Sequence, residues 1–524
     1  MPILTYSVGT LQSDPEIFLE IKRKASPMAN EKEEWKSRIG FILAAVGAAI
    51  GLGNIWRFSY LCYKNGGGAF LIPYIIALLT AGIPLLILEY GIGHKFRGSA
   101  ALSFYKIGKN WEWVGWWPSI FVVIGITFYY TVILAWCLDY IWYSVTLKWG
   151  ANSADFFYHQ HLHLSNSFWH LGSPSTIIFV GLIIIWIFNW LIELRGVQRG
   201  IELACKIFIP LLVVLTTILV IRGVTLPGSG KGLIWYLKPN FSHLTNPRVW
   251  LDAYGQIFFS LSLAMATMIA YASYLPRKSD IVGNAYVTGF ANSTFSLFAG
   301  FAVFGTLGFI SFQQGLPPSE VVKGGFGLAF IAYPQAISAM PVGARLFGII
   351  FFSALVIAGL SSSISQIEGL VASLIDKFGW KRKKIIHIIS LLGILVGLIY
   401  TTGSGYHLLD LIDHFISSYL LVLIGFLEAF VVGWIFKAEN LRSYVNDISN
   451  IRVGKWWNFM IKYFIPFVLG VTFILSLKSD LVHRYGNYPI TAIIFIGFGS
   501  VILTFLIAFF FYKKKWKTAG NIQN

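Results

Sequence analysis

Polar side chains interrupt the apolar stretches of this sequence in five places. In chain order these are Asn54 with Arg57, Glu89, Gln256 with Ser260 and Ser262, Asn292 with Ser296, and Ser361 to Ser363. Their hydroxyls and amides can bind a small ion or solute, whereas no His/Cys metal spacing, phosphate loop or Ser/His/Asp set accompanies them. Any one of them could instead form a hydrogen bond between helices. Together they predict a binding site whose cargo is not changed chemically, and therefore a protein that is not an enzyme.

The segments that carry these residues have the composition of membrane helices. The chain of 524 residues is 56% hydrophobic and 12% charged, unlike a soluble domain. A helix needs about 20 apolar residues to cross a bilayer. Twelve such spans are predicted, near residues 39–62, 68–94, 115–147, 175–194, 198–224, 249–275, 280–313, 341–376, 383–401, 407–436, 456–478 and 488–513. The expected fold is an all-α polytopic membrane protein.

The formal net charge of +17 is distributed unevenly over the loops. Basic residues gather between alternate spans and at the end of the last one: Lys95, Arg97, Lys106, Lys109, Arg195, Arg199, Arg277, Lys278, Lys381, Lys384, Lys513 and Lys515. Because cytoplasmic loops carry an excess of Lys and Arg, both termini are predicted to be cytoplasmic. The basic runs indicate contact with the lipid bilayer, and nucleic-acid binding is not expected.

The ends of the chain and its cysteines bear on localisation. Residues 1–34 are polar and are interpreted as a cytoplasmic tail rather than a signal peptide, and residues 514–524 as a second tail. Cys62, Cys137 and Cys205 all fall inside spans, so no disulfide scaffold is expected. Compact termini and the lack of loop cysteines favour a cell membrane, specifically a bacterial inner membrane.

The segment AAIGLGNIWRF, residues 48–58, places two glycines and an asparagine inside the first span. Gly47, Gly51 and Gly53 lower the cost of unwinding about one helical turn at mid-depth. Unwound backbone is tolerated in a membrane only where protein, water or a ligand satisfies it. Its carbonyls can hold a dehydrated sodium ion, and the amides of the next half-helix can face an anion. Close packing against another helix is the alternative that the glycines leave open.

These motifs resemble the neurotransmitter:sodium symporter family, including its bacterial amino-acid transporters. The matching segments are WKSRIGFILAAVGAAIGLGNIWRF, NGGGAFLIPY, GIPLLILEYGIG, YGQIFFSLSLAMATMIAYASYLP, FANSTFS, AGLSSSISQIEGL and DLIDHFISSYLLVLIGFLEAF. They are long, ordered and specific, and the likeness extends over residues 35–513.

The resemblance implies a five-plus-five inverted repeat in which the first and sixth spans are broken at the centre. The transporter domain would cover residues 35–513, with a first repeat at 35–224, a second at 249–436 and two extra helices at 456–513. Only the resemblance implies the second break, because SLSLAMA contains neither Gly nor Pro. Relatives carry glycines where this chain has Ala264 and Ala266.

The resemblance also implies two sodium sites. The first would use the carbonyls of Ala49 and Ser260, the side chains of Asn54 and Asn292, and the carboxylate of the substrate. The second would use the carbonyls of Gly47, Ile50 and Ala358 and the hydroxyls of Ser361 and Ser362. Ligation by oxygen alone suits a hard cation.

The substrate implied by the resemblance is an amino acid. Its carboxylate would meet the amides of Leu52 and Gly53 and the hydroxyl of Tyr130. Its ammonium would meet the carbonyls of Ala49, Phe259 and Ser260 and the hydroxyl of Ser262. Helix N-termini favour the anion and exposed carbonyls favour the cation, as a zwitterion requires. Relatives that carry monoamines have an aspartate at the position of Gly51, so the glycine favours amino-acid cargo.

The side-chain pocket implied by the resemblance is lined by Ile126, Phe259, Met265, Ser363 and Gln366. Met265 adapts to different shapes, and Gln366 could hydrogen-bond a polar or indole-bearing side chain. Gln366 could equally face a neighbouring helix. Neutral amino acids of medium or large size, including aromatic ones, are the expected substrates.

Two gates are assigned in the same way. Arg57 and Asp413 correspond to the extracellular pair above Phe259, whereas Lys32 and Asp376 belong to the cytoplasmic closure. The family has an arginine where this chain has Lys32, and a lysine replaces a bidentate fork with a point charge. A weaker inner gate is therefore expected.

Charge balance predicts a chloride site. Sodium ions at two sites bring positive charge into a low-dielectric core, where unpaired charge is costly. Chloride-independent bacterial relatives place a glutamate near the first sodium, but the matching residue here is Ser296. The neutral set that resembles the chloride site of animal relatives is Tyr74, Gln256, Ser260, Asn292 and Ser296. Buried acids elsewhere, such as Glu89, could supply the negative charge instead.

The sequence thus predicts a sodium-coupled secondary active symporter that imports amino acids by alternating access, with chloride as a further ion. A membrane sensor that binds an amino acid without moving it is one alternative, although no soluble signalling domain is evident. Proton coupling is another, and the hydroxyl and asparagine ligands favour sodium.

Overall fold

The computed structural model describes residues 33–317 and 325–518, and these ranges are helical and contain no β-strand. An isolated bridge joins Gly67 and Pro239. Most of the tail expected at 1–34, with Lys32, and the end of the tail expected at 514–524 lie outside the described residues. The all-α expectation is confirmed for the part of the chain that the structure describes.

The helices follow one another with short connections. In chain order they are α2 (Arg38–Ala49), α3 (Phe58–Lys64), α4 (Gly68–Ala77), α5 (Ile83–Phe96), α6 (Ala100–Ile107), α7 (Glu112–Phe121), α8 (Phe128–Thr146), α9 (Ser153–Asp155), α10 (Thr176–Leu194), α11 (Leu203–Val224), α12 (Ser229–Leu237), α13 (Pro247–Ser260), α14 (Thr267–Ser273), α15 (Ile281–Gln314), α16 (Gly325–Gly327), α17 (Tyr333–Ala339), α18 (Ala344–Phe378), α19 (Arg382–Tyr400), α20 (Gly405–Phe415), α21 (Leu421–Phe430), α22 (Ala438–Ile448), α23 (Lys455–Phe459), α24 (Ile465–Val482), α25 (Ile490–Ala492) and α26 (Gly499–Lys513). Wider π-helical turns join several neighbours, among them η1 (Gly53–Arg57), η4 (Val122–Thr127), η6 (Val197–Glu202) and η9 (Leu328–Ala332).

Ten helical stretches in the described ranges are long and apolar enough to cross a membrane, and each overlaps one expected span. An eleventh consists of two pieces, Arg38–Ala49 and Gly53–Lys64, which meet at 57°. The span expected at 249–275 is divided between α13 and α14, neither of which is long enough to cross alone.

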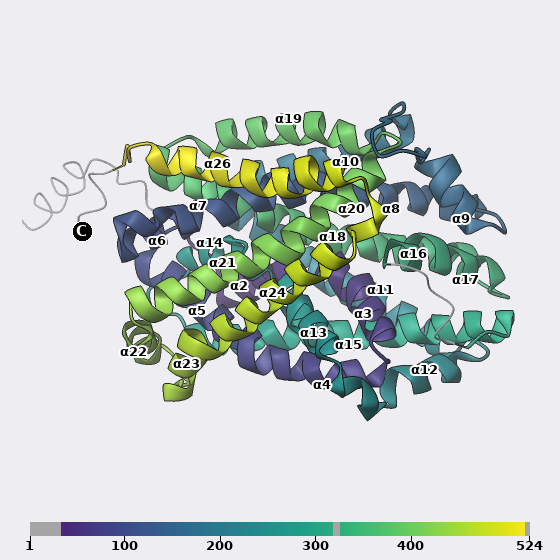
Figure 1. The fold of residues 1–524 in the computed structure, drawn as a ribbon, viewed down its shortest axis with the longest axis horizontal. Coiled ribbons are helices and arrows are strands. Elements are labelled where there is room, and N and C mark those ends of the chain that lie inside the picture. The colour runs from purple at the N-terminus through teal and green to yellow at the C-terminus, as the bar shows by residue number, and fades with distance from the viewer. Residues whose placement is uncertain (1–32, 318–324, 519–524) are drawn as a thin grey trace, which may run out of the picture.

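The two interrupted spans and the helices that pack against them form the interior. Figure 1 shows α2, α14 and α18 behind α24 and α26, which cross the face toward the viewer. The long helix α18 packs against α8, α11 and α2. Exposed apolar side chains on α24 and α26, such as Phe467 and Phe510, suit contact with lipid.

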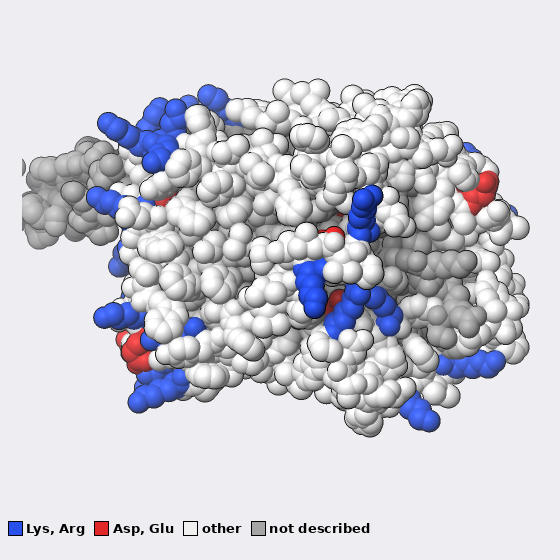
Figure 2. Space-filling model, in the orientation of Figure 1, with Lys and Arg blue, Asp and Glu red and all other residues white. Residues whose placement is uncertain are grey.

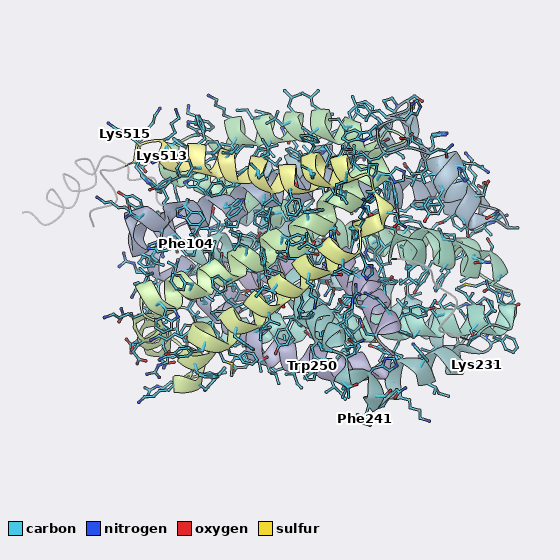
Figure 3. All side chains as sticks on the ribbon, in the orientation of Figure 1. Phe104, Lys231, Phe241, Trp250, Lys513 and Lys515 are labelled. Carbon is cyan, nitrogen blue, oxygen red and sulfur yellow. The ribbon has the colours of Figure 1, made fainter. Side chains whose placement is uncertain are left out.

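Most of the visible surface carries no charged side chains. Figure 2 shows them gathered at the left end of the molecule, in a patch right of centre and at the right-hand end. Lys513 and Lys515 lie at that left end, and Lys231, in the first turn of α12, lies toward the opposite end (Figure 3). A broad uncharged surface between charged ends is the pattern that a bilayer requires.

The first break follows from the glycine-rich segment, as expected. Helix α2 ends at Ala49, and Ile50 has an extended ψ of 99°. The helical path resumes at Gly53, and the side-chain oxygen of Asn54 accepts from the amide of Gly51 at 3.0 Å. Asn54 therefore satisfies one of the amides that unwinding exposes.

The second break occurs without glycine. Ser262, Ala264 and Ala266 have positive φ values of 52°, 58° and 61°, a region that costs L-residues with a β-carbon about 1–2 kcal/mol each. The amide of Ala264 donates to Oε1 of the buried Glu89 at 2.8 Å, and Ser262 Oγ donates to the carbonyl of Ala48 at 2.9 Å. Hydrogen bonds from other helices thus hold a backbone that local propensity disfavours.

Candidate substrate and ion site

A cavity lies between the two breaks and brings most of the predicted residues together. Its walls come from the first span, α8, α13 with the segment after it, and α18. The lining residues are Ala48, Ala49, Gly51, Gly53, Asn54, Tyr130, Phe259, Ser260, Ser262, Met265, Ser362 and Gln366. A site of this kind joins exposed carbonyls, helix-terminal amides and an apolar wall.

Three residues predicted for substrate do not line this cavity. Ile126 is buried in the π-helical turn η4, and the amide of Leu52 donates to the hydroxyl of Tyr130 at 3.3 Å. Ser363 Oγ donates to Oδ1 of Asn189 on α10 at 2.6 Å. The direction of its side chain follows from the packing of α18 against α10, which no local pattern reveals.

Oxygen atoms converge where the first sodium was expected. The side-chain oxygen of Asn292 accepts from Asn54 Nδ2 at 2.7 Å, and this contact fixes the orientation of the amide. The same oxygen lies 3.1 Å from the carbonyl of Ala49 and 3.2 Å from that of Ser260. Turning the amide would satisfy both carbonyls but would set two NH₂ groups against each other. Three acceptors this close favour a hard cation between them.

The residues expected at the second sodium also meet. Ser361 Oγ lies 2.8 Å from the carbonyl of Ala358 and 3.4 Å from that of Ile50. Ser362 Oγ lies 3.5 Å from the carbonyl of Ile50. A β-carbon added at Gly47 would lie 3.4 Å from Cβ of Ser361, so this glycine borders the same cluster. Oxygen donors from the first span and α18 could therefore share one cation.

The neutral groups expected to hold chloride form one buried cluster. The hydroxyl of Tyr74 donates to Ser293 Oγ at 3.2 Å, with Ser260 and Ser296 close by. Ser296 Oγ accepts from Asn54 Nδ2 at 2.8 Å, which links this cluster to the oxygens around Asn292. Gln256 Nε2 donates to the carbonyl of Gly53 at 3.1 Å. Hydroxyl and amide donors beside a cation site can stabilise an anion.

Gly51 and Gly53 leave room that no side chain could occupy. A β-carbon at Gly51 would lie 2.6 Å from Ser362 Oγ and 3.1 Å from the hydroxyl of Tyr130. A β-carbon at Gly53 would lie 2.9 Å from the ring of Phe259. The hydroxyls and backbone amides around Gly51 can approach a small anionic group only because this position lacks a side chain.

Gln366 has a partner that sequence reasoning missed. Thr127 Oγ1 donates to Oε1 of Gln366 at 2.9 Å, and Gln366 faces the cavity. A threonine inside an apolar span gives no signal by itself, because its hydroxyl can bond within its own helix. Thr127 Oγ1 indeed also lies 2.9 Å from the carbonyl oxygen of Val122, one turn earlier in the chain. Thr127 orients the amide at the apolar wall.

Phe259 lines the cavity on the side where the extracellular gate was expected. The guanidinium of Arg57 lies 4.2 Å from the centre of the Phe259 ring. Asp413, the expected partner of Arg57, accepts from the hydroxyl of Tyr129 at 2.5 Å and from Ser417 at 3.2 Å. In the described ranges no ion pair within 4.0 Å joins Arg57 with Asp413.

The segment before α2, where the cytoplasmic closure was expected, packs against the end of α14. The amide of Trp35 donates to the carbonyl of Tyr274 at 3.0 Å, and its indole donates to the carbonyl of Tyr271 at 2.8 Å. Asp376, expected in this closure, accepts from the amide of Ser99 at 2.7 Å. Lys32 lies outside the described residues.

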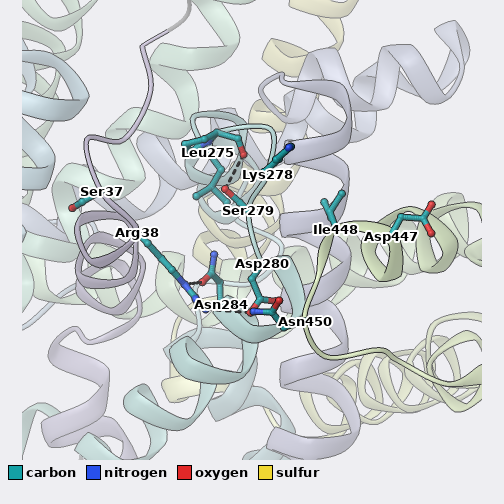
Figure 4. Close-up of a pocket in the computed structure, with 11 residues that line it drawn as sticks. Ser37, Arg38, Leu275, Lys278, Ser279, Asp280, Asn284, Asp447, Ile448 and Asn450 are labelled. Carbon is teal, nitrogen blue, oxygen red and sulfur yellow. Dashed lines mark hydrogen bonds and ion pairs between the residues drawn. The ribbon is translucent and has the colours of Figure 1, made fainter.

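A second hollow opens near the same end. Its lining includes Arg38, Asp280, Asn284 and Asn450, and none of the residues predicted for substrate or ions. Figure 4 shows Arg38 reaching toward Asn284 and Asp280, with Asn450 beside Asp280. Arg38 lies 3.2 Å from Asp280 and donates to Asn284 at 3.0 Å. These contacts tie the start of α2 to the start of α15.

The sequence matches known proteins along most of its length. The model of the Sodium:neurotransmitter symporter family matches residues 32–153 and 150–518. The chain belongs to this family. It is 47% identical over 485 residues to an uncharacterized sodium-dependent transporter of Methanocaldococcus jannaschii, covering 93% of this chain and 98% of that one.

Two animal members of the symporter family are also similar. The sodium- and chloride-dependent taurine transporter of Rattus norvegicus is 34% identical over 508 residues, which cover 88% of this chain and 81% of that protein. The sodium- and chloride-dependent GABA transporter 2 of the same species is 34% identical over 85% of this chain and 80% of its own length. The resemblance seen in the sequence is confirmed, and the protein is a member of a family of sodium-dependent membrane transporters.

Proposed function

We propose that this symporter imports neutral amino acids by alternating access, driven by sodium at two sites between the broken spans. The observation that carries the proposal is the convergence of Asn292 Oδ1 with the carbonyls of Ala49 and Ser260, at 3.1 and 3.2 Å. Oxygen atoms in this arrangement repel one another until a cation separates them. The cluster of Ser361, Ser362, Ile50 and Ala358 supports a second sodium site.

The proposed architecture has twelve membrane helices, with α13 and α14 counted as the broken sixth span. The repeats would cover residues 35–224 and 249–436 in inverted orientation, followed by two extra helices at 456–513. Both termini would be cytoplasmic, because basic residues gather between alternate spans. The predicted setting is a cell membrane, and a bacterial inner membrane remains a prediction.

The proposed cargo is a zwitterion. Amides near Gly53 and the hydroxyl of Tyr130 would meet its carboxylate, and the carbonyls of Ala49, Phe259 and Ser260 would meet its ammonium. The clash that any side chain at Gly51 would make supports an amino acid that supplies its own carboxylate. The relatives named for taurine and GABA also carry molecules with one acidic and one amino group. Phe259, Met265 and Gln366 would contact the side chain of the substrate.

Chloride is proposed as the compensating anion. Tyr74, Ser260, Asn292 and Ser296 gather beside the proposed first sodium, with Gln256 next to them. Two relatives at 34% identity are named as chloride-dependent, which supports the same property here. A negative ion would offset the charge that sodium brings into this buried site.

Uptake into proteoliposomes tests the proposal. Labelled amino acids should accumulate under an inward sodium chloride gradient and should not accumulate when potassium replaces sodium. Replacing chloride by gluconate should reduce accumulation. Accumulation in potassium driven by a proton gradient would favour proton coupling instead, and tight binding without accumulation in any condition would favour the sensor.

A further inference from the structure

Two buried carboxyl groups share one guanidinium at the end of the molecule where Trp35 binds the end of α14. Glu368 on α18 binds Arg382 in a bidentate pair at 2.6 and 2.8 Å. Glu193 on α10 lies 3.2 Å from the same Nη1 atom. Both carboxylate side chains have no exposed surface, and Arg382 is 12% exposed.

The charges in this cluster do not balance if both acids are ionised. In the described part of the chain, both carboxyl groups form their ion pair with the same cation, Arg382. Oε1 of Glu193 has no hydrogen-bond partner among the described residues. Tyr274 donates its hydroxyl to Oε1 of Glu368 at 2.5 Å, so Glu368 is the better stabilised anion. Two like charges in a low-dielectric site disfavour double ionisation.

Among the described residues, the other titratable groups around the pair do not supply the missing positive charge. Those that face it from the neighbouring elements are Glu33, Tyr271, Tyr274, Cys205, Glu202 and Asp376. Lys206 pairs with Glu202 at 2.6 Å and is therefore already neutralised. Glu33 lies 4.0 Å from Arg382 and is half exposed, which adds negative charge.

We propose that Glu193 and Glu368 form a proton-binding site that holds one proton while the inner gate is closed. The site takes a proton from water to convert one carboxylate into a carboxylic acid, and it returns that proton to water when the cluster is hydrated. No other reactant is needed. With one proton bound, the two carboxyl groups together carry one negative charge, which the positive charge of Arg382 balances.

The site is joined to the segment before α2, where the inner gate is proposed. Glu33 accepts from the amide of Val197 at 2.7 Å and lies beside Arg382. Trp35 follows two residues later and binds α14. Loss of the proton would leave two anions competing for Arg382, so deprotonation should loosen this end of the molecule. This consequence for transport rests on the proposed function, whereas proton binding does not.

Infrared spectroscopy of the purified full chain tests proton binding directly. At about pH 7 the wild type should show a C=O band of a protonated carboxyl group that is missing in Glu193→Gln. Glu368→Gln should lose the same band, because the single remaining carboxylate then ionises beside Arg382. Glu202→Gln is the matched control and should keep the band, since Glu202 is a buried acid already paired with Lys206.

Either variant suffices if the other does not fold. A band of wild-type size in Glu193→Gln or Glu368→Gln would overturn the proposal, whatever the protein transports. In proteoliposomes, uptake by the wild type should fall as the cytoplasmic side is acidified, because the proton holds the gate closed. Glu193→Gln should remove that pH dependence. If uptake is absent in all proteins but the band behaves as expected, the proposed transport is wrong and the proton site stands.

Discussion

The side-chain oxygen of Asn292 lies 3.1 Å from the carbonyl oxygen of Ala49, and neither atom carries a hydrogen. This contact joins α15 to the break in the first span, and a sodium ion would turn repulsion into shared ligation. Replacing Asn292 by Ala should weaken sodium binding by at least about tenfold, or about 1.4 kcal/mol. Sodium-dependent thermal stabilisation of the purified protein measures this affinity. Thr306→Ala, on the same helix away from the site, should leave it unchanged.

Gly51→Ala should weaken amino-acid binding while leaving the fold intact. The added β-carbon would lie 2.6 Å from Ser362 Oγ and would displace the hydroxyls around the expected carboxylate position. We expect affinity to fall by more than about tenfold, measured by equilibrium binding of labelled substrate. Gly255→Ala is the matched control, because nothing lies within 4 Å of its added β-carbon. Wild-type affinity in Gly51→Ala would contradict the proposed position of the carboxylate.

Ala264→Gly and Ala266→Gly should each stabilise the protein. Both alanines have positive φ, at 58° and 61°, where glycine avoids the steric cost of a β-carbon. The gain should be about 1 kcal/mol at each position, seen as a higher melting temperature. Ala270→Gly within α14 should instead destabilise by about 1 kcal/mol, because glycine disfavours a helix interior. A lower melting temperature in all three variants would mean that the strain at the break is absorbed elsewhere.

Ser296→Glu should make uptake independent of chloride. Ser296 Oγ lies 2.8 Å from Asn54 Nδ2, so a carboxylate there would supply negative charge beside the proposed sodium. Sodium-driven uptake in gluconate should then equal uptake in chloride. Ser296→Gln has the same size without the charge and should not confer this independence. Chloride dependence that persists in Ser296→Glu would place the anion elsewhere.

His161 should make stability depend on pH on the acid side. Burial lowers its pKa to about 3, with His163 and Lys148 adding like-charge repulsion. The unfolded chain binds a proton near pH 6.5, so between about pH 6.5 and pH 3 it holds more protons than the folded chain. Stability should therefore be complete above this range and fall as the pH decreases through it.

Melting temperatures across this pH range test the role of His161. His161→Gln removes the titrating group and should flatten the profile, whereas His159→Gln changes an exposed histidine of the same loop and should not. A wild-type slope in His161→Gln would assign the acid sensitivity to another residue.

Much of the fold could be predicted because it depends on composition and local geometry. Apolar stretches long enough to cross a bilayer predicted the positions of eleven spans, which the structure contains as continuous or bent helices. Such a stretch must be helical because the backbone N–H and C=O groups have no water to hydrogen-bond in the bilayer. Gly51 and Gly53 marked the first break, because glycine lowers the cost of leaving the helix. The ordered motifs also identified the family, which the matches over residues 32–153 and 150–518 confirm.

The second break and the direction of polar side chains were decided by tertiary structure. Ala264 adopts a left-handed conformation because Glu89, distant in sequence, accepts from its amide. Ser363 faces Asn189 rather than the cavity, and Thr127 meets Gln366 across two helices. Composition and propensity act over one or two helical turns, whereas these partners are separated by more than 170 residues. The packing of the helices therefore decides whether a given polar side chain faces an ion, the substrate or a neighbouring helix.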